Sequence, residues 1–151
     1  MADELLSIMV SNEGVVDALN ALSQRMGNLS PVMRDIGQGL EREIRKRFAS
    51  ESDPNGAAWH PLAASTKLNR AKTGARGGIL EHSGTMLELL GWQASDKSVQ
   101  VGFTQPYAVH HEFGTRKMPR RGMLFGDQNT GELGASDEAL VLDLLADYLA
   151  G

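Results

Sequence analysis

Residues 105–125 read QPYAVHHEFGTRKMPRRGMLF, and they predict more local structure than any other stretch of the chain. Pro106 suits the first turn of a helix, because its fixed φ fits the helix and its missing N–H would have no partner there. Gly114 suits the end of that helix, since glycine enters the left-handed conformation without a Cβ penalty. The stretch therefore predicts a short helix, a basic loop over 115–121 and a short buried apolar strand over 122–126.

Hydrophobic periodicity predicts the elements around this stretch. Apolar residues at helical spacing indicate a helix that follows a cap at Ser11 or Asn12, and a second helix over 31–50 that is about 30 Å long. Two segments read as the strands of a hairpin, one from residue 83 or 85 to residue 95 and the other over 98–104, because the second alternates apolar and polar positions. The apolar stripe of the long helix comprises Val32, Met33, Ile36, Leu40, Ile44 and Phe48.

The last predicted element is an amphipathic helix over 136–149 that Ser136 would cap. Together these elements indicate an α+β fold, in which a long helix and a C-terminal helix pack on a small, mostly antiparallel sheet. A length of 151 residues fits a single domain over 1–151. Gly37 and Gly39 each cost the long helix about 1 kcal/mol relative to alanine. We therefore expect either a close-packing site, most readily with another helix, or a kink at these positions.

Residues 51–78 predict a long extended loop with an arm-like character. The stretch lacks a sustained period and is rich in small, polar and basic residues, with a helical turn or two over 64–71. Loops of this length within a compact domain are usually functional or disordered. One interpretation is a solvated loop. The other is an arm that becomes ordered against a neighbouring subunit, with Trp59 and Leu62 as apolar anchors and Arg70 among its charges.

Composition and motifs argue against an enzyme, a cofactor site and a metal site. The chain has 15 basic and 19 acidic residues, a net charge of −4 and no cysteine. This balance lacks the basic footprint of a general nucleic-acid binder. His110 and His111 would point about 100° apart on a helix, so they cannot easily share one ion. The other histidines, His60 and His82, lie in separate segments. No apolar run approaches the roughly 18 residues of a membrane span.

The basic loop has two interpretations. Arg116, Lys117, Arg120 and Arg121 could be solvated charges on a turn. Alternatively, they contact acidic residues of a neighbouring subunit, where the planar guanidinium gives bidentate specificity. Contact with DNA that passes through a ring is a third use of the same charges. Sequence-specific reading is not expected, because no aromatic residues alternate with the basic ones.

Two runs within the opening stretch resemble the phage virion morphogenesis family. The family signature is Tyr-Ala-x-x-His-(Gln/Glu)-Phe-Gly followed by Met-Pro-x-Arg-x-hydrophobic-Leu. Here residues 107–114 read YAVHHEFG and residues 118–124 read MPRRGML, with Gly122-Met123 in place of a common Pro-Phe pair. Upstream segments around Trp59 and over 79–86 and 99–102 follow in the family's order. The resemblance covers about residues 30–149.

The resemblance implies a structural virion protein of the head–tail junction, which completes or terminates the tail and joins it to the head as an oligomeric ring, most often hexameric. The implied partners are further copies of the chain, other neck and tail proteins, and genomic DNA passing through the channel. Assembly would take place in the host cytoplasm. One alternative is a capsid morphogenesis factor that is not retained at the joint, and another is a DNA-packaging or nuclease accessory. The candidate interface residues are Trp59, Leu62, Arg70, Tyr107, His110, Phe113, Arg116, Lys117, Arg120 and Arg121.

Overall fold

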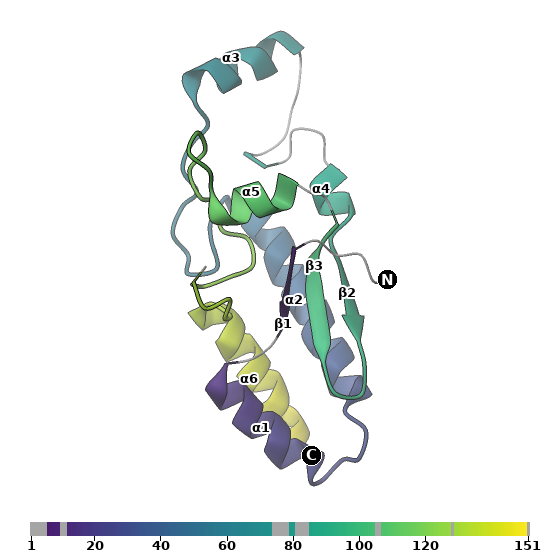
Figure 1. Cartoon of the computed structure of the whole chain (residues 1–151). Helices are drawn as coiled ribbons and strands as arrows, with labels where there is room; N and C mark the ends of the chain where they lie inside the picture. The colour runs from purple at the N-terminus through teal and green to yellow at the C-terminus, as the bar shows by residue number, and fades with distance from the viewer. Residues whose placement is uncertain are drawn as a thin grey trace.

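The structure is a computed structural model that describes residues 6–9, 12–73, 79–80, 85–104, 107–127 and 129–150. Figure 1 shows an elongated α+β molecule, which confirms the predicted fold class. In chain order the elements are β1 (Leu6–Met9), α1 (Glu13–Ser23), α2 (Ser30–Ser50), α3 (Ala64–Thr73), α4 (Thr85–Glu88), β2 (Gly91–Ala94), β3 (Val99–Phe103), α5 (Tyr107–Phe113) and α6 (Ala135–Ala150).

The sheet is antiparallel and has the strand order β1-β3-β2. The predicted hairpin of β2 and β3 is confirmed, with Trp92 opposite Val101. Its first strand is shorter than predicted, because residues 85–88 form the helical turn α4. Met, Leu and Glu in that turn are good helix formers, and it has only one β-branched residue. Residues 83 and 84 lie outside the described part of the chain.

The long helix α2 organises the core. It packs along β2 and β3 on one side, and α6 packs against both α2 and α1 (Figure 1). The stripe predicted for α2 is buried throughout, which confirms the helical spacing. On the sheet, the alternate residues Val99, Val101 and Phe103 of β3 are buried beneath this helix. The helix–sheet and helix–helix layers therefore share α2.

The two glycines of α2 mark its closest contacts. A Cβ at Gly37 would lie 2.7 Å from the Trp92 ring of β2, and one at Gly39 would lie 3.0 Å from the Leu140 side chain of α6. Close approach is confirmed at both positions. The expectation of a helix neighbour holds for Gly39, whereas at Gly37 the neighbour is an aromatic ring on a strand.

Two residues predicted to cap helices, Asn12 and Ser136, use their side chains to bind distant parts of the chain instead. Asn12 directly precedes α1 but does not cap it with its side chain. Its amide accepts the Leu133 N–H at 3.0 Å and donates to Glu138 of α6. Ser136 lies inside α6, and its hydroxyl donates to the Pro54 carbonyl at 3.2 Å. Tertiary partners have replaced local capping at both residues. The prediction at Ser11 falls outside the described residues.

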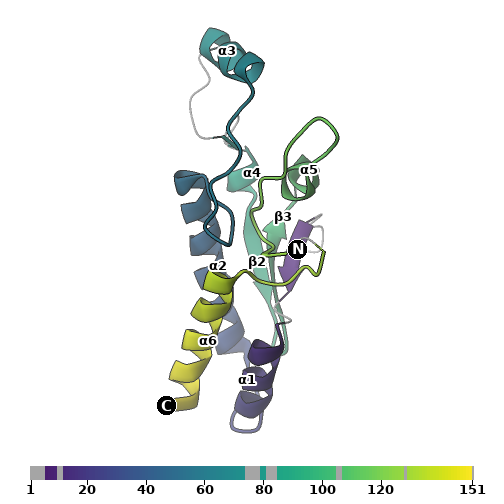
Figure 2. The same cartoon turned by 90° about the vertical axis from the view of Figure 1, so that its left-hand side faces the viewer.

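The molecule has two distinct ends. Helix α3 extends beyond the body at one end, on a segment that the sequence predicts as an arm, and the C-terminal ends of α1 and α6 lie at the other (Figures 1 and 2). Helix α5 and the loop after it lie between the arm and the body. The candidate interface residues therefore gather toward the arm end.

Candidate assembly surfaces

Helix α5 forms as its sequence predicts. Gly114 ends it with a φ of 76°, and the Gly114 N–H donates to the His110 carbonyl at 2.8 Å. Ala108 and Glu112 are fully buried and lie one helical turn apart, so they define the inward face of α5. A carboxyl group is thus directed into the core from this helix.

The Glu112 carboxylate holds the buried segment that follows the basic loop. It accepts the N–H groups of Met123 at 2.9 Å, Leu124 at 2.7 Å and Phe125 at 3.4 Å, and Arg120 at 2.9 Å. Residues 122–125 are buried as predicted but do not form a strand, because these amides bind a side chain instead of a neighbouring strand. Burial raises the pKa of the Glu112 carboxyl, while the N–H groups and Arg120 oppose that increase.

Two of the four loop cations bind within the chain. Arg120 donates from Nε to the Glu112 carbonyl at 2.8 Å and from Nη2 to the Phe125 carbonyl at 2.9 Å. Arg121 is buried and donates to the carbonyl groups of His60 at 2.8 Å and Pro61 at 3.0 Å. The interface interpretation is therefore corrected for the buried Arg121, whereas Arg120 is partly exposed and its interface role stays a prediction. Their guanidinium groups join α5, the buried segment and the start of the arm.

Trp59 also belongs to the interior. Its side chain is 5% exposed, and its Nε1–H donates to the Gly122 carbonyl at 2.8 Å. Its ring packs edge-on against the Phe48 ring, with 5.4 Å between the ring centroids. The expectation that Trp59 plugs a neighbouring subunit is corrected, because the chain's own core already encloses it. Leu62, three residues later, is only partly buried and begins the transition to the arm.

The remaining candidates on and after α5 are exposed. We call Tyr107, His110, Phe113, Arg116 and Lys117 the α5 surface. Tyr107 is 37% exposed and Phe113 is 41% exposed, which is high for aromatic side chains. The loop turns tightly beside them, because the Thr115 N–H donates to the Met118 carbonyl at 2.9 Å. The structure therefore leaves two aromatic rings and two cations exposed along α5 and the loop after it, and their interface role stays a prediction.

Helix α3 is the most exposed element of the arm. Leu68 is 60% exposed, and Lys67 and Lys72 are exposed on the same helix. The backbone at Arg70 is helical, but its side chain lies outside the described residues. A groove of about 530 Å³ separates the base of α3 from α5, and its described lining includes Leu62, His111 and Lys117. Burial, and then Arg121 and His110, lower the pKa of His111 in this groove.

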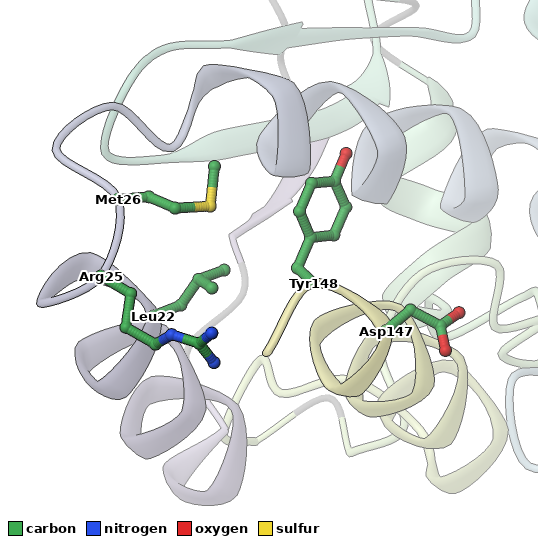
Figure 3. A pocket seen from close by; sticks show the side chains of 5 residues that line it. All are labelled: Leu22, Arg25, Met26, Asp147 and Tyr148. Atoms are coloured by element: carbon green, nitrogen blue, oxygen red, sulfur yellow. The ribbon is translucent and has the colours of Figure 1, made fainter. Parts of the chain in front are cut away.

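A second hollow lies at the opposite end of the molecule. Figure 3 shows the pocket of about 440 Å³ between α1 and α6. Leu22 and Met26 come from the end of α1 and the turn after it, while Asp147 and Tyr148 come from α6. Arg25 reaches across the gap and donates to the Leu149 carbonyl. The pocket is lined by apolar side chains and by Arg25, while the Asp147 carboxylate points away from the other lining residues (Figure 3).

Among the described residues, no three His, Cys, Asp or Glu side chains form a group that could hold a metal ion. His82 lies outside this part of the chain. No helix there is both long and apolar enough to cross a membrane.

Three buried charged side chains were missed by sequence reasoning. Arg47 of α2 forms a buried ion pair with Asp137 of α6 and also donates to the Met123 carbonyl at 2.7 Å. Glu112 is the third. Its position four residues after Ala108, on the inward face of α5, is a signal that could have identified it. No comparable local signal marks the pair of Arg47 and Asp137, which are 90 positions apart.

The sequence pattern of the phage virion morphogenesis family matches residues 10–150 of this chain. The chain is also similar to Mu-like prophage FluMu G protein 2 from Haemophilus influenzae, with 24% identity over 145 residues that cover 95% of this chain and 96% of the relative. No solved structure matches. Because the family match extends over nearly the whole chain, this protein belongs to the phage virion morphogenesis family.

Proposed function

We propose that this chain is a structural protein of the phage head–tail junction, where an oligomeric ring of copies completes the tail and joins it to the head. Membership of the virion morphogenesis family places its role in the building of a phage particle. The observation that carries the finer proposal is the gathering of exposed apolar and basic groups at the arm end. Such groups contribute strongly to binding when a partner covers them.

The exposed apolar residues support an assembly role. The large exposed apolar side chains of the described residues are Val16, Leu68, Leu89, Tyr107 and Phe113. All except Val16 belong to α3, α5 or the turn after α4, close to the arm end in Figure 1. The charged residues Arg116 and Lys117 accompany the two aromatic rings. A surface of this mixed kind is typical of protein–protein contacts.

We also propose that the chain works without catalysis, a metal or a cofactor. The most buried acid, Glu112, holds backbone N–H groups in the core, and Arg120 balances its charge. Arg121 and Trp59 similarly hold backbone carbonyl groups. The charged groups of the family signature thus support a surface, and the partners we infer are further copies of the chain and other neck and tail proteins. Genomic DNA would pass through the ring, near Arg116 and Lys117.

Deletion of this chain from the phage that encodes it tests the proposal. We expect filled heads and separate tails in electron micrographs, because the joint would be missing. Mass spectrometry of purified virions should detect the chain in the wild-type particle, and labelled antibody should locate it between head and tail. Malformed heads together with absence of the chain from mature virions would overturn the proposal and favour a capsid morphogenesis factor.

A further inference from the structure

Strand β2 lies at one edge of the sheet, because the strand order is β1-β3-β2 (Figure 1). Edge strands are usually protected against pairing by charged side chains, by proline, by a bulge or by their shortness. Residues 91–94 read GWQA, without charge or proline, and each of them has one partner on β3, so the strand has no bulge. Only its length of four residues limits pairing, and this edge is therefore open to another strand.

The hairpin determines which main-chain groups of β2 point outward. The Ser95 N–H donates to the Ser98 carbonyl at 2.8 Å, so this pair closes the hairpin with a hydrogen bond. Hydrogen-bonded and non-hydrogen-bonded pairs alternate along an antiparallel ladder. Gln93 therefore bonds to β3, whereas Trp92 and Ala94 direct their N–H and C=O groups away from it. Within the described residues, these outward groups have no hydrogen-bond partner.

Two copies of β2 are complementary to each other. In an antiparallel pair with Gln93 opposite its counterpart, Trp92 of each copy lies opposite Ala94 of the other. Both of these pairs would be hydrogen-bonded, and together they would satisfy every outward main-chain group of the two strands. No like charges would oppose each other within the pair, because β2 has no charged residue. A second copy of the same strand is therefore a sufficient partner.

The residues on either side of β2 also match in this register. Leu89 directly precedes the strand end and is 44% exposed, and Glu88 and Lys97 are exposed as well. Counting outward from the Gln93 pair places Lys97 of one copy opposite Leu89 of the other and next to Glu88, while Asp96 falls one position farther away. Within the described part of the chain, neither Glu88 nor Lys97 forms an ion pair. An exposed apolar side chain and opposite charges thus meet at both ends of the pair.

We propose that β2 of one copy pairs antiparallel with β2 of a second copy about a twofold axis at Gln93, which joins two three-stranded sheets into one. The axis is perpendicular to the sheet, so α2 of both copies covers the same face of it. Such a contact is isologous and joins two copies. A ring then needs a second, different contact, for which the α5 surface stays a candidate. The inference does not depend on where in the particle the chain acts.

Charge placed at the axis of the full-length chain tests the pairing. Like charges directly opposite each other oppose strand pairing, so Gln93→Lys should weaken self-association at least about threefold in sedimentation velocity, and so should Gln93→Glu. Gln93 is exposed, and circular dichroism should therefore show that both variants are folded. Gln100→Lys is the matched control, because Gln100 lies opposite Gln93 on β3 and one strand farther from the axis. It should leave the association constant within about twofold.

Mixing the two weakened variants gives a sharper result. Gln93→Lys and Gln93→Glu each oppose a like charge when they pair with themselves, whereas a mixed pair places opposite charges at the axis. The equimolar mixture should therefore associate at least as strongly as the wild-type chain, as heterodimers. Association in the mixture that is no stronger than in the separate variants would overturn the proposal. A wild-type chain that remains monomeric at its solubility limit would overturn it as well.

A single cysteine locates the axis, since the chain has no cysteine of its own. Only at the axis does a side chain face its own counterpart, and the Cβ atoms of such a non-hydrogen-bonded pair are close enough for a disulfide. Gln93→Cys should therefore form a disulfide-linked dimer under mild oxidation, whereas Gln100→Cys should stay unlinked. Equal cross-linking of both variants, or none in Gln93→Cys, would overturn the proposed pairing. If dimers form but virions lack the chain, the contact stands and the proposed junction role fails.

Discussion

The 107–125 segment and helix α3 both lie toward one end of the molecule, and both are basic, yet they use their charges differently. In the first, Arg120 and Arg121 bind a carboxylate and backbone carbonyl groups inside the chain. In the second, Lys67 and Lys72 face outward around an exposed Leu68. The difference shows that local charge density does not identify a binding surface. What decides is whether the fold supplies acceptors, and among the described side chains it does so for Arg120 and Arg121 but not for the exposed Lys67 and Lys72.

Of the changes in the 107–125 segment, Glu112→Ala should lower the free energy of unfolding the most. Removing one partner of a buried ion pair costs about 3–5 kcal/mol in the free energy of unfolding. Each of the amides left without an acceptor adds to this cost. Urea denaturation should measure the loss, and Glu112→Gln should recover part of it by keeping one acceptor oxygen.

The exposed Arg116→Ala serves as the control for Glu112. It should change the free energy of unfolding by no more than about 0.5 kcal/mol. Equal decreases in the free energy of unfolding for the two variants would mean that the Glu112 carboxylate does not stabilise the 107–125 segment.

Trp59→Ala and Leu68→Ala compare a buried apolar side chain that contacts the 107–125 segment with an exposed one on α3. Trp59→Ala removes a buried ring and its hydrogen bond to Gly122, at a cost of about 3–5 kcal/mol. Leu68→Ala should be close to neutral for the isolated chain, because the side chain is already exposed. Thermal unfolding of both variants measures the contrast. A stable, fully folded Trp59→Ala protein would return this residue to the role of an intermolecular plug.

Gly37→Ala extends the comparison to the contact between α2 and β2. The added methyl group would meet the Trp92 ring at 2.7 Å, so overpacking should cost about 1–3 kcal/mol. Gly14→Ala is the matched control in α1, where a Cβ meets nothing within 4 Å. That change should stabilise the chain by about 0.4–1 kcal/mol. Chemical denaturation of the two variants should therefore give shifts of opposite sign.

The smallest predicted effect comes from His111, at the boundary between the two regions. Its pKa is lowered in the folded chain, first by burial and then by Arg121 and His110. The unfolded chain therefore binds a proton near pH 6.5 while the folded chain does not, and stability should fall as pH drops below about 6.5. His111→Gln should remove this pH dependence, whose total size is about 1.4 kcal/mol in the free energy of unfolding for each unit by which the pKa is lowered. The exposed His60→Gln is the control and should retain the slope.

Local periodicity was sufficient to predict the body of the fold. The stripe of α2 from Val32 to Phe48 repeats at helical spacing, and β3 alternates, so both could be found without tertiary information. The end of α5 at Gly114 has an equally local cause. These features depend on residues a few positions apart, and a single sequence contains them fully.

The candidate site could be predicted only in part. Tyr107, Phe113 and Arg116 are exposed and remain candidates, but the partners of Arg121 are carbonyl groups about 60 positions away. Asn12 was correctly placed at the start of a helix, yet its side chain binds Leu133, 121 positions later. Spacing rules contain no information about such partners, so they assigned these side chains to solvent, to caps or to neighbouring subunits.

One carboxylate performs the hydrogen bonding that an adjacent strand would usually supply across several residues. Because Glu112 projects from α5 and also holds Arg120, the basic loop is tied at both ends to a single helical turn. A molecule that contacts α5 and displaces it would shift Arg116 and Lys117 in the same movement. The exposed residues of α5 and of the basic loop would therefore move together, because both are attached to the buried Glu112 carboxylate.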